Sequence, residues 1–442
     1  MNDKREIRGW AMYDWANSAF STTVVTALLG PYVLALAESS TSRLTFFGTQ
    51  VEPAAIFPFA ASLSVGLQVV FLPILGTIAD YTHLKKRMLL TFAYLGALAT
   101  ILLFFIQADS PIIGTNGALL LSGLLLMLAN LCFGAAVVFY NAFLPEIASP
   151  DRRDAVSSQG FALGYLGGGL LLLINLGMLT LMDDTALAVR LSLASAGVWW
   201  LLFTYLYPQR RLKQRKAARE LPPGASLLTQ GLKEIWSTVK DLFHHYPQTL
   251  LFLVAYLIYN DGVQTVIIVS TAFAADELEV ATDMLLILVL MIQFVAFFGA
   301  LGFGRLARYI GAKRAILISL VIWSGIVIFA YAALHEVWQL FVLGFFVAIV
   351  LGGSQALSRS LFSQMIPRDH ESEYFGFYEV SERGTSWLGP LAFAFAVQAT
   401  GSQRSAIITL IVFFLVGLVL LSLVNVQKAM LDAGNDPSGV VL

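Results

Sequence analysis

The sequence predicts an all-α integral membrane protein with twelve transmembrane helices, arranged as two pseudo-symmetric six-helix bundles with both termini in the cytoplasm. Three observations predict this fold class. The 442 residues are 58% hydrophobic and only 12% charged, whereas soluble chains are about 45–50% apolar and about 25% charged. Apolar runs long enough to cross a bilayer recur along the whole chain, and three short polar motifs occur twice in the same order.

The number of spans follows from the length of the apolar runs. A transmembrane helix needs about 20 mostly apolar residues, and long runs of this kind fit helices rather than the short alternating strands of an outer-membrane barrel. Two predicted spans carry charges: 248–273 contains Asp261, and 374–398 contains Glu379, Glu382 and Arg383. The other ten are free of charge and cover 15–37, 53–79, 88–108, 117–140, 155–182, 191–209, 284–304, 315–334, 337–358 and 405–427.

The loops between these spans set the orientation. With an even number of spans, both termini lie on one side, and the segments on that side hold 23 Lys and Arg residues. The opposite segments hold three, namely Arg43, Arg190 and Arg404. Because cytoplasmic loops carry the excess of basic residues, we expect cytoplasmic termini and, in a prokaryote, a multi-pass protein of the cytoplasmic (inner) membrane.

The long inner segment 208–247 divides the spans into six and six. We therefore expect an N-terminal bundle over 1–207, a second bundle over 248–428 and a tail over 429–442. The linker carries one apolar helical stripe, typical of an amphipathic helix at a membrane surface, which serves either as a docking element or as a tether. The stripe comprises Leu228, Leu232, Ile235, Trp236, Val239, Leu242 and Phe243.

The two predicted bundles repeat three motifs. "GTIADYTHLKKR" from Gly76 matches "GRLARYIGAKR" from Gly304, and "PDRRDAVSSQGF" from Pro150 resembles "PRDHESEYFGF" from Pro367. The third pair is "DWANS" from Asp14 and "DGVQT" from Asp261. Each pair holds the same topological position, so we interpret the chain as two related halves.

These motifs resemble the major facilitator superfamily. Its signature between the second and third spans is a Gly, an acid four residues later and a basic pair. In that superfamily this loop helps close the cytoplasmic side, so the resemblance implies gating residues rather than substrate ligands. The positions that match or correspond here are Gly76, Asp80, Lys85 and Lys86 and, in the second copy, Arg308, Lys313 and Arg314.

Within the superfamily, the chain is similar to the vacuole effluxer-like family of fungal amino-acid effluxers. The phrases that carry this resemblance are "YDWANSAF", "LPEIASPDRRDAVSSQGFALGYLGGG" and "YNDGVQTV". The resemblance implies export, with amino acids as a substrate class, while prokaryotic members leave the solute open. Gly160, Gly164, Gly168 and Gly169 resemble an exporter motif of the fifth span, and the alternative is close helix packing by small residues.

Ionisable groups inside a bilayer are costly and face a cavity or a partner, which selects candidate substrate or coupling residues. Asp261 lies mid-span beside Asn260 and Gly262, so we expect local unwinding there. Gln264, Asp14, Asn17 and Ser18 join it through the repeat, although Asp14 is equally explained as a gate or a helix start. Glu379 and Arg383 are spaced for an internal ion pair, and Glu382 is left without a local partner. Further candidates to line the same cavity are Asn141, Gln159, Gln355 and Arg359.

Together these features predict a secondary active transporter that works by alternating access. The favoured function is export of a small organic solute, amino acids included, with proton entry through Asp261 or Glu382. The alternatives are an uptake symporter of the same fold and a non-transporting receptor or lipid-handling protein. We expect no enzyme, cofactor, metal site or nucleic-acid partner. The expected partners are the lipid bilayer, the solute and protons or another coupling ion, and the chain is expected to be a monomer.

Overall fold

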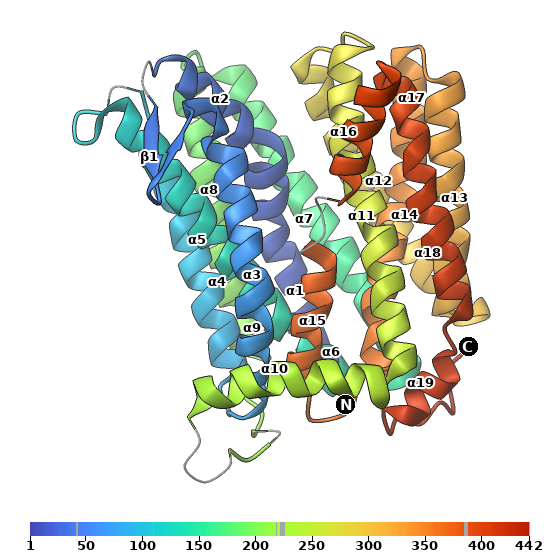
Figure 1. Ribbon diagram of the computed structural model, residues 1–442. Helices are drawn as coiled ribbons and strands as arrows, with labels where there is room; N and C mark the ends of the chain where they lie inside the picture. The colour runs from blue at the N-terminus through green and yellow to red at the C-terminus, as the bar shows by residue number, and fades with distance from the viewer. Residues whose placement is uncertain (41–42, 109, 218, 222–225, 384–387, 442) are drawn as a thin grey trace.

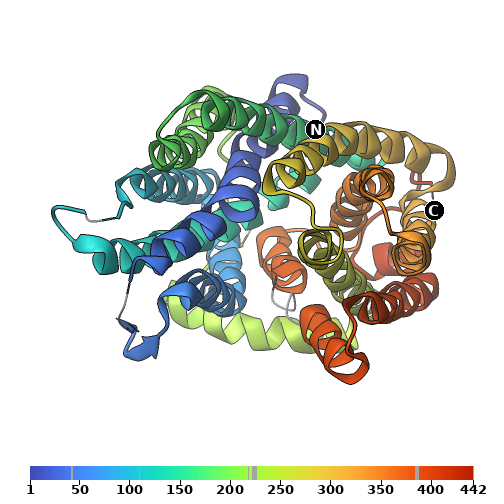
Figure 2. The same cartoon turned by 90° about the horizontal axis from the view of Figure 1, so that it is seen from above.

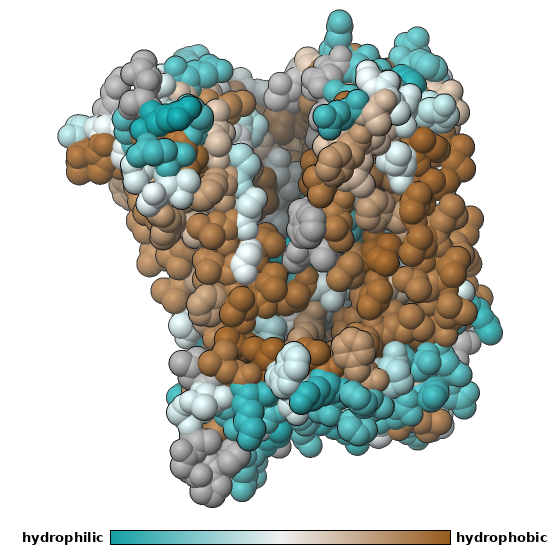
Figure 3. All heavy atoms as spheres, viewed as in Figure 1, coloured by the Kyte–Doolittle hydropathy of each residue, from teal (hydrophilic) through white to brown (hydrophobic). Residues whose placement is uncertain are grey.

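The computed structural model describes residues 1–40, 43–108, 110–217, 219–221, 226–383 and 388–441. Two helical bundles stand side by side, one built from each half of the chain (Figures 1 and 2). Eleven helices in the described part are long and apolar enough to cross a membrane. Apolar side chains cover the sides of the molecule, and polar ones gather at its two ends (Figure 3). The chain is therefore a multi-pass membrane protein.

The first half contains the predicted spans one to six and ends in the linker helix. Strands β1 and β2 form a small antiparallel hairpin between the first two spans, with Leu44 opposite Val51. The elements are α1 (Lys4–Ala19), η1 (Phe20–Leu28), α2 (Leu29–Glu38), β1 (Leu44–Phe46), β2 (Thr49–Val51), η2 (Pro53–Ala55), α3 (Ile56–Asp80), α4 (Lys85–Leu102), η3 (Leu103–Phe105), α5 (Gly114–Ala142), α6 (Leu144–Ile147), η4 (Pro150–Arg152), α7 (Arg153–Leu181), α8 (Thr185–Leu206), α9 (Pro208–Arg211) and α10 (Leu227–His244).

The second half contains five of the eleven candidate membrane helices. The predicted span 374–398 falls on α15 and α16, and residues 384–387 between them lie outside the described residues. The elements are α11 (Pro247–Asp276), α12 (Thr282–Ile310), α13 (Ala312–Ala333), α14 (Val337–Gln364), α15 (Glu371–Arg383), α16 (Leu388–Thr400), α17 (Gln403–Ile407), η5 (Ile408–Leu410), α18 (Ile411–Leu423) and α19 (Val426–Asp432).

The first span begins ten residues before its polar stretch. Asp3 caps α1, and its carboxylate accepts a hydrogen bond from the Arg5 amide at 2.9 Å. Asp14 therefore lies well inside the helix, so its interpretation as a helix start is wrong. The α-helix continues through Asn17 and changes to a π-helix only at Phe20.

The expected unwinding at Gly262 is also wrong, because α11 runs without a break from Pro247 to Asp276. The glycine serves packing instead. A Cβ at Gly262 would lie 2.8 Å from the Phe413 Cβ, which is closer than two carbon atoms approach without repulsion. The missing side chain thus lets α18 approach α11.

The repeated motifs mark two equivalent contacts between the halves. Gly76 near the end of α3 meets the backbone of Ser372 in α15, and Gly304 near the end of α12 meets Ser158 in α7. At both positions a Cβ would overlap the facing atoms. The two halves therefore approach each other through glycines at related positions, as small residues at membrane helix contacts permit.

The predicted amphipathic helix is present as α10 and lies across the base of both bundles, on the side where the two termini lie (Figures 1 and 2). We call this the α10 side. Glu234 of α10 accepts a hydrogen bond from the Tyr81 hydroxyl at 2.7 Å, and Thr238 donates one to Glu373 of the second half. Trp236 and Phe243 are exposed. The helix joins the two halves on this side.

Candidate functional site

A cavity of about 520 Å³ lies between the two halves. Side chains of α1, η1, α3, α5 and α7 line it from the first half, and those of α11, α12, α14 and α15 line it from the second. A hollow between the bundles is visible on the side away from α10 (Figure 3). Its lining mixes apolar side chains with amides, hydroxyls and four charged groups: Asp14, Arg359, Glu382 and Arg383.

An ion pair between the halves borders this cavity. The Asp14 carboxylate of α1 lies 3.2 Å from the Arg359 guanidinium of α14, and the Tyr140 hydroxyl donates to the same carboxylate at 2.7 Å. The side chains of Asp14 and Arg359 are buried. A buried pair of this kind stabilises only when its remaining donors and acceptors are also bonded.

Arg359 meets that condition because all of its nitrogens donate. Its Nε donates to the Ser157 hydroxyl at 2.9 Å, and its two terminal nitrogens donate to Asp14, to the Ser157 carbonyl and to the Asn141 amide oxygen. Its guanidinium also lies over the rings of Trp10, Tyr140 and Phe161 at 4.2–5.3 Å. Arg359 is one of the 23 basic residues counted above on the cytoplasmic side, and that count was wrong for it, because it lies within α14 and is held by the opposite half.

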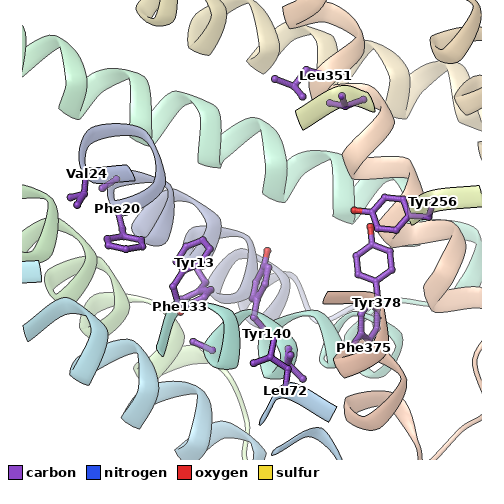
Figure 4. Close-up of a cluster of buried hydrophobic side chains, with 14 of the residues drawn as sticks. Tyr13, Phe20, Val24, Leu72, Phe133, Tyr140, Tyr256, Leu351, Phe375 and Tyr378 are labelled. Carbon is purple, nitrogen blue, oxygen red and sulfur yellow. The ribbon is translucent and has the colours of Figure 1, made fainter. Parts of the chain in front are cut away.

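Asn141 connects this pair to a second one. Its amide nitrogen donates to Glu379 at 2.8 Å, and its amide oxygen accepts from Arg359 at 3.3 Å. The predicted pair within α15 is present, with the Arg383 Nε 3.1 Å from the Glu379 carboxylate. Tyr378, the neighbour of Glu379, stacks on Tyr256 of α11 with ring centroids 4.5 Å apart (Figure 4). A chain of polar groups thus runs from α1 through α14 and α5 to α15.

Glu382 differs from the other carboxylates of the cavity. Within the described residues its carboxylate has no hydrogen bond and no base within 4.0 Å, while its backbone carbonyl accepts from the Asn260 amide at 2.9 Å. Helix α15 therefore carries one paired carboxylate, that of Glu379, and one unpaired carboxylate, that of Glu382, and only Glu382 lines the cavity. Asn260 itself is buried and holds α11 against α15.

Asp261 does not line this cavity, unlike its repeat partner Asp14. Its side chain is buried, and one carboxylate oxygen accepts from the Gly389 amide of α16 at 2.6 Å. Within the described residues the other oxygen has no hydrogen-bond partner. The repeat therefore relates the two acids in sequence, but only Asp14 reaches the space between the halves.

The remaining candidates divide by their place on the helices. Asn17, Ser18, Gln264 and Gln355 line the cavity, and Gln355 accepts from the Tyr165 hydroxyl at 2.8 Å. Gln159 is exposed, so its expected place in the cavity is wrong. The next residue, Gly160, faces Asp14 and Arg359, and one residue along a helix turns the side chain by about 100°.

The glycines of α7 are explained by close packing on the first span. A Cβ at Gly164 would lie 2.7 Å from the Ser18 hydroxyl, and one at Gly168 would lie 2.6 Å from the Thr22 hydroxyl. Gly169 faces Gln293 of α12 instead. These contacts bring the polar residues of α1 and η1 against α7 and so place them beside the cavity.

The α10 side is closed by the loop after α3. Both Asp80 carboxylate oxygens accept backbone amides of α15, from Ser372 at 3.1 Å and from Glu373 at 2.9 Å. Lys85 lies 3.7 Å from Asp80 and 2.6 Å from Glu146. The carboxylate at the first turn of α15 has the favourable orientation toward a helix N-terminus. Asp80 thereby joins the two halves on the α10 side.

The second copy of this loop behaves differently. Lys313 donates to the Ser422 and Val424 carbonyls of its own half, and Arg308 and Arg314 are exposed. Lys86 is half-buried and makes no ion pair within the described part of the chain. Among the seven predicted positions, the contacts across the halves come from Gly76 and Asp80, whereas Lys85 binds Asp80 and Glu146 of its own half.

Sequence reasoning missed several residues that join the halves. Arg153 donates to the Ser363 carbonyl at 2.7 Å, and Ser157 donates to the Ala356 carbonyl at 2.6 Å. Both lie in the motif that begins at Pro150, and weighing each polar residue of that motif could have found them. Gln293 donates to the Thr22 hydroxyl at 3.2 Å, and it is a polar residue within a charge-free run.

The chain resembles known proteins in its sequence. A family model described as "Vacuole effluxer Atg22 like" matches residues 2–434. The chain belongs to the vacuole effluxer Atg22-like family. It is 33% identical to the uncharacterized MFS-type transporter YxiO of Bacillus subtilis (strain 168), over 95% of each chain. It is 24% identical to autophagy-related protein 22-1 of Penicillium rubens, over 97% of this chain and 91% of that one.

Solved structures place this family member in the major facilitator fold. A bacterial homologue of the iron transporter ferroportin in an outward-facing state aligns with a TM-score of 0.64 at 12% identity, over 95% of this chain and 98% of that one. The MFS transporter FucP in the outward conformation aligns with a TM-score of 0.63 at 14% identity, over 95% and 98%. Together with its relative YxiO, this makes the chain a membrane transporter of the major facilitator fold.

Proposed function

We propose that this Atg22-like protein is a secondary active exporter of a small organic solute, amino acids included, and that export is coupled to proton entry. In this proposal the termini and α10 face the cytoplasm of a prokaryotic inner membrane, and the protein works as a monomer of two six-helix halves, with α15 and α16 together forming the eleventh of twelve spans. The basic α10 side supports this orientation. The family's description as effluxers supports the direction.

One observation carries the proposal. The cavity is lined by both halves, and on the α10 side the halves are joined by Asp80, by the Asp14–Arg359 ion pair and by two glycine contacts. A cavity closed on one side by contacts between halves is what alternating access requires. A receptor or lipid-handling protein needs no polar cavity that both halves build.

The geometry suggests how the halves exchange access. In the described state, the inner contacts hold the halves together and the solute reaches the cavity from outside. Rocking the halves apart on the α10 side would break the Asp14–Arg359 pair and release the Asp80 carboxylate from α15. The cavity then opens to the cytoplasm. Asp14 and Arg359 act as gate residues in this scheme, because Arg359 has no donor left for a solute.

The test is transport by the purified full chain in proteoliposomes. A panel of the twenty amino acids is presented with and without a pH gradient, and empty liposomes serve as the control. The proposal expects at least one amino acid to move against its gradient when protons move the other way. Movement of no solute or proton under any gradient contradicts transport, and movement with the proton in the same direction identifies a symporter.

A further inference from the structure

The charged groups in and beside the cavity include one acid more than base, because the buried Glu379 adds to the two acids and two bases of the lining. Three carboxylates belong to its polar chain, and two guanidiniums face them. Asp14 pairs with Arg359 at 3.2 Å, and Glu379 pairs with Arg383 at 3.1 Å. Glu382 is the carboxylate that remains. When all five groups are ionised, the cavity therefore carries one uncompensated negative charge.

No base elsewhere in the chain compensates Glu382. Within the described residues no Lys, Arg or His lies within 4.0 Å of its carboxylate. The residues outside the described ranges include no Lys, Arg or His at all. Glu382 is half-buried on the wall of the cavity, and an ionised group inside a bilayer faces a cavity or a partner, so a proton or a cation that enters the cavity can reach its carboxylate.

The surroundings of Glu382 suit an organic cation. Tyr165 lines the same cavity, and aromatic faces attract ammonium groups. The Arg383 guanidinium already lies over the ring of Phe133, and Tyr256 and Phe362 stack on Tyr378. Apolar walls from Val137 and Ile267 leave room for a hydrocarbon part. Calcium-like ions take six or more oxygen ligands, whereas the described residues contain no group of three His, Cys, Asp or Glu side chains that could hold a metal ion.

We propose that Glu382 binds the ammonium group of the solute and a proton in turn, and that each excludes the other. This rests on the proposed exchange of solute for protons and names the group at which the exchange takes place. On the outside, a proton forms an O–H bond with Glu382 while the ammonium contact breaks and the solute leaves. On the cytoplasmic side, a new ammonium group replaces that proton, which leaves to water. The carboxylate is neutralised in both transits.

The other titratable groups around Glu382 are paired, neutral or outside the cavity, so we assign the exchange to Glu382. On its own helix, Glu379 and Arg383 neutralise each other, as Asp14 and Arg359 do across the cavity. The phenols of neighbouring helices are neutral near pH 7, and Asp261 is held by the Gly389 amide outside the cavity. Asp80 of α3 binds the opposite end of α15. The phenols are those of Tyr165, Tyr256, Tyr259 and Tyr378.

Three matched probes distinguish binding through the ammonium group of an amino acid from binding through its carboxylate. L-leucinamide keeps the ammonium group alone, N-acetyl-L-leucine keeps the carboxylate alone, and L-leucine keeps both. Each is added to the full chain in detergent in weakly buffered solution, with binding measured by calorimetry and proton release by a pH indicator. We expect leucinamide and leucine to bind and release protons, and N-acetyl-leucine to do neither.

Variants of the carboxylate complete the test. Glu382→Gln should abolish proton release and weaken leucinamide binding about tenfold or more, while Glu382→Asp retains both in part. Glu38→Gln, at an exposed helix end, should behave as wild type, and thermal unfolding checks that every variant is folded. Proton release by Glu382→Gln, binding without release by wild type, equal binding of N-acetyl-leucine, or no binding of any probe overturns the inference. Leucine transport by wild type in liposomes alongside any of these results leaves the exporter proposal standing.

Discussion

The Asp14 carboxylate of α1 and the Arg359 guanidinium of α14 lie 3.2 Å apart, and this buried ion pair joins residues 345 positions apart in the chain. Tyr140 and Ser157 of the first half bond to the same two groups. The second half therefore contributes an arginine whose partners almost all belong to the first half. Any movement that separates the halves here must remove Arg359 from this set of acceptors.

Removing one member of this ion pair should destabilise the fold more than removing both members. Asp14→Asn leaves a buried guanidinium without its counter-ion, and breaking a buried pair in this way costs about 3–5 kcal/mol. Asp14→Asn combined with Arg359→Gln removes the charge as well, so we expect a higher unfolding temperature for the double variant than for Asp14→Asn alone. Thermal unfolding in detergent measures both. A double variant no more stable than the single one would show that the two charges are not coupled.

The two repeated glycines should control closure on the α10 side. Gly76→Val and Gly304→Val place a side chain where the opposite half lies, and overpacking of this kind costs about 1–3 kcal/mol. That energy disfavours the described state, so both variants should open the α10 side. Ser363→Cys, buried in this interface, reports the opening by faster reaction with a thiol reagent, in a background where Cys132 is replaced by Ser.

Each glycine has a control on its own helix. Gly66 of α3 and Gly302 of α12 have no heavy atom within 4 Å of the position a Cβ would take. Gly66→Val and Gly302→Val carry the same propensity change without the clash, so labelling of Ser363→Cys should match the unmodified glycine background. Equal acceleration by all four valines would attribute the effect to helix propensity rather than to contact between the halves.

His370 should make the α10 side more stable at lower pH. Burial lowers the pKa of His370, but its hydrogen bond with Glu373 and the charges of Glu373 and Asp80 outweigh burial and the nearby Arg219, so its pKa lies above the ordinary value. A raised pKa means that protonated His370 stabilises the fold. That contribution is complete below the unfolded pKa of about 6.5 and is lost as pH rises through the folded pKa.

The measurement is the unfolding temperature of wild type and His370→Gln at about pH 5.5 and about pH 8.5, on either side of the ordinary pKa. Partly exposed pairs contribute about 0.2–1 kcal/mol, so the advantage of wild type should be small and confined to the lower pH. His335, in an exposed loop, gives the control variant His335→Gln. An advantage that grows toward high pH would have the wrong sign.

Replacing Asn141 should weaken closure of the α10 side more than replacing Asn130 of the same helix. Asn141→Leu removes the amide that bonds both Glu379 and Arg359, and an unmade buried hydrogen bond costs about 1–3 kcal/mol, more next to a charge. Asn130→Leu removes an amide that bonds Ser64 within the first half. We expect faster labelling of Ser363→Cys for Asn141→Leu alone. Equal labelling of both variants would exclude a role of Asn141 between the halves.

Much of the fold could be predicted because the bilayer constrains composition so strongly. Eleven of the twelve predicted spans fall on helices of the described residues that are long and apolar enough to cross a membrane, the stripe from Leu228 to Phe243 became α10, and the spacing of Glu379 and Arg383 produced their ion pair. The predictions that were wrong depended on tertiary contacts. Gly262 does not unwind α11 because Phe413 packs against it, and nothing in the local sequence shows that contact.

The candidate site could be predicted in residue type but not in pairing. Asp14 and Arg359 were both candidates, yet their distance in sequence gave no reason to join them, and Arg359 was counted with the loops. Its mid-span position favoured Asp261 over Asp14, whereas only Asp14 reaches the cavity. Pseudo-symmetry relates backbones, and it does not require that two related side chains meet the same surroundings.

The central claim is that the solute passes through the cavity between the halves, and one measurement tests it most directly. Gln264 lines the cavity from α11, and Leu202 is exposed on α8. Amino-acid uptake into proteoliposomes under a pH gradient is compared for wild type, Gln264→Trp and Leu202→Trp. The account predicts that Gln264→Trp loses transport while remaining folded and that Leu202→Trp retains it. Transport by Gln264→Trp at the wild-type rate would contradict the account.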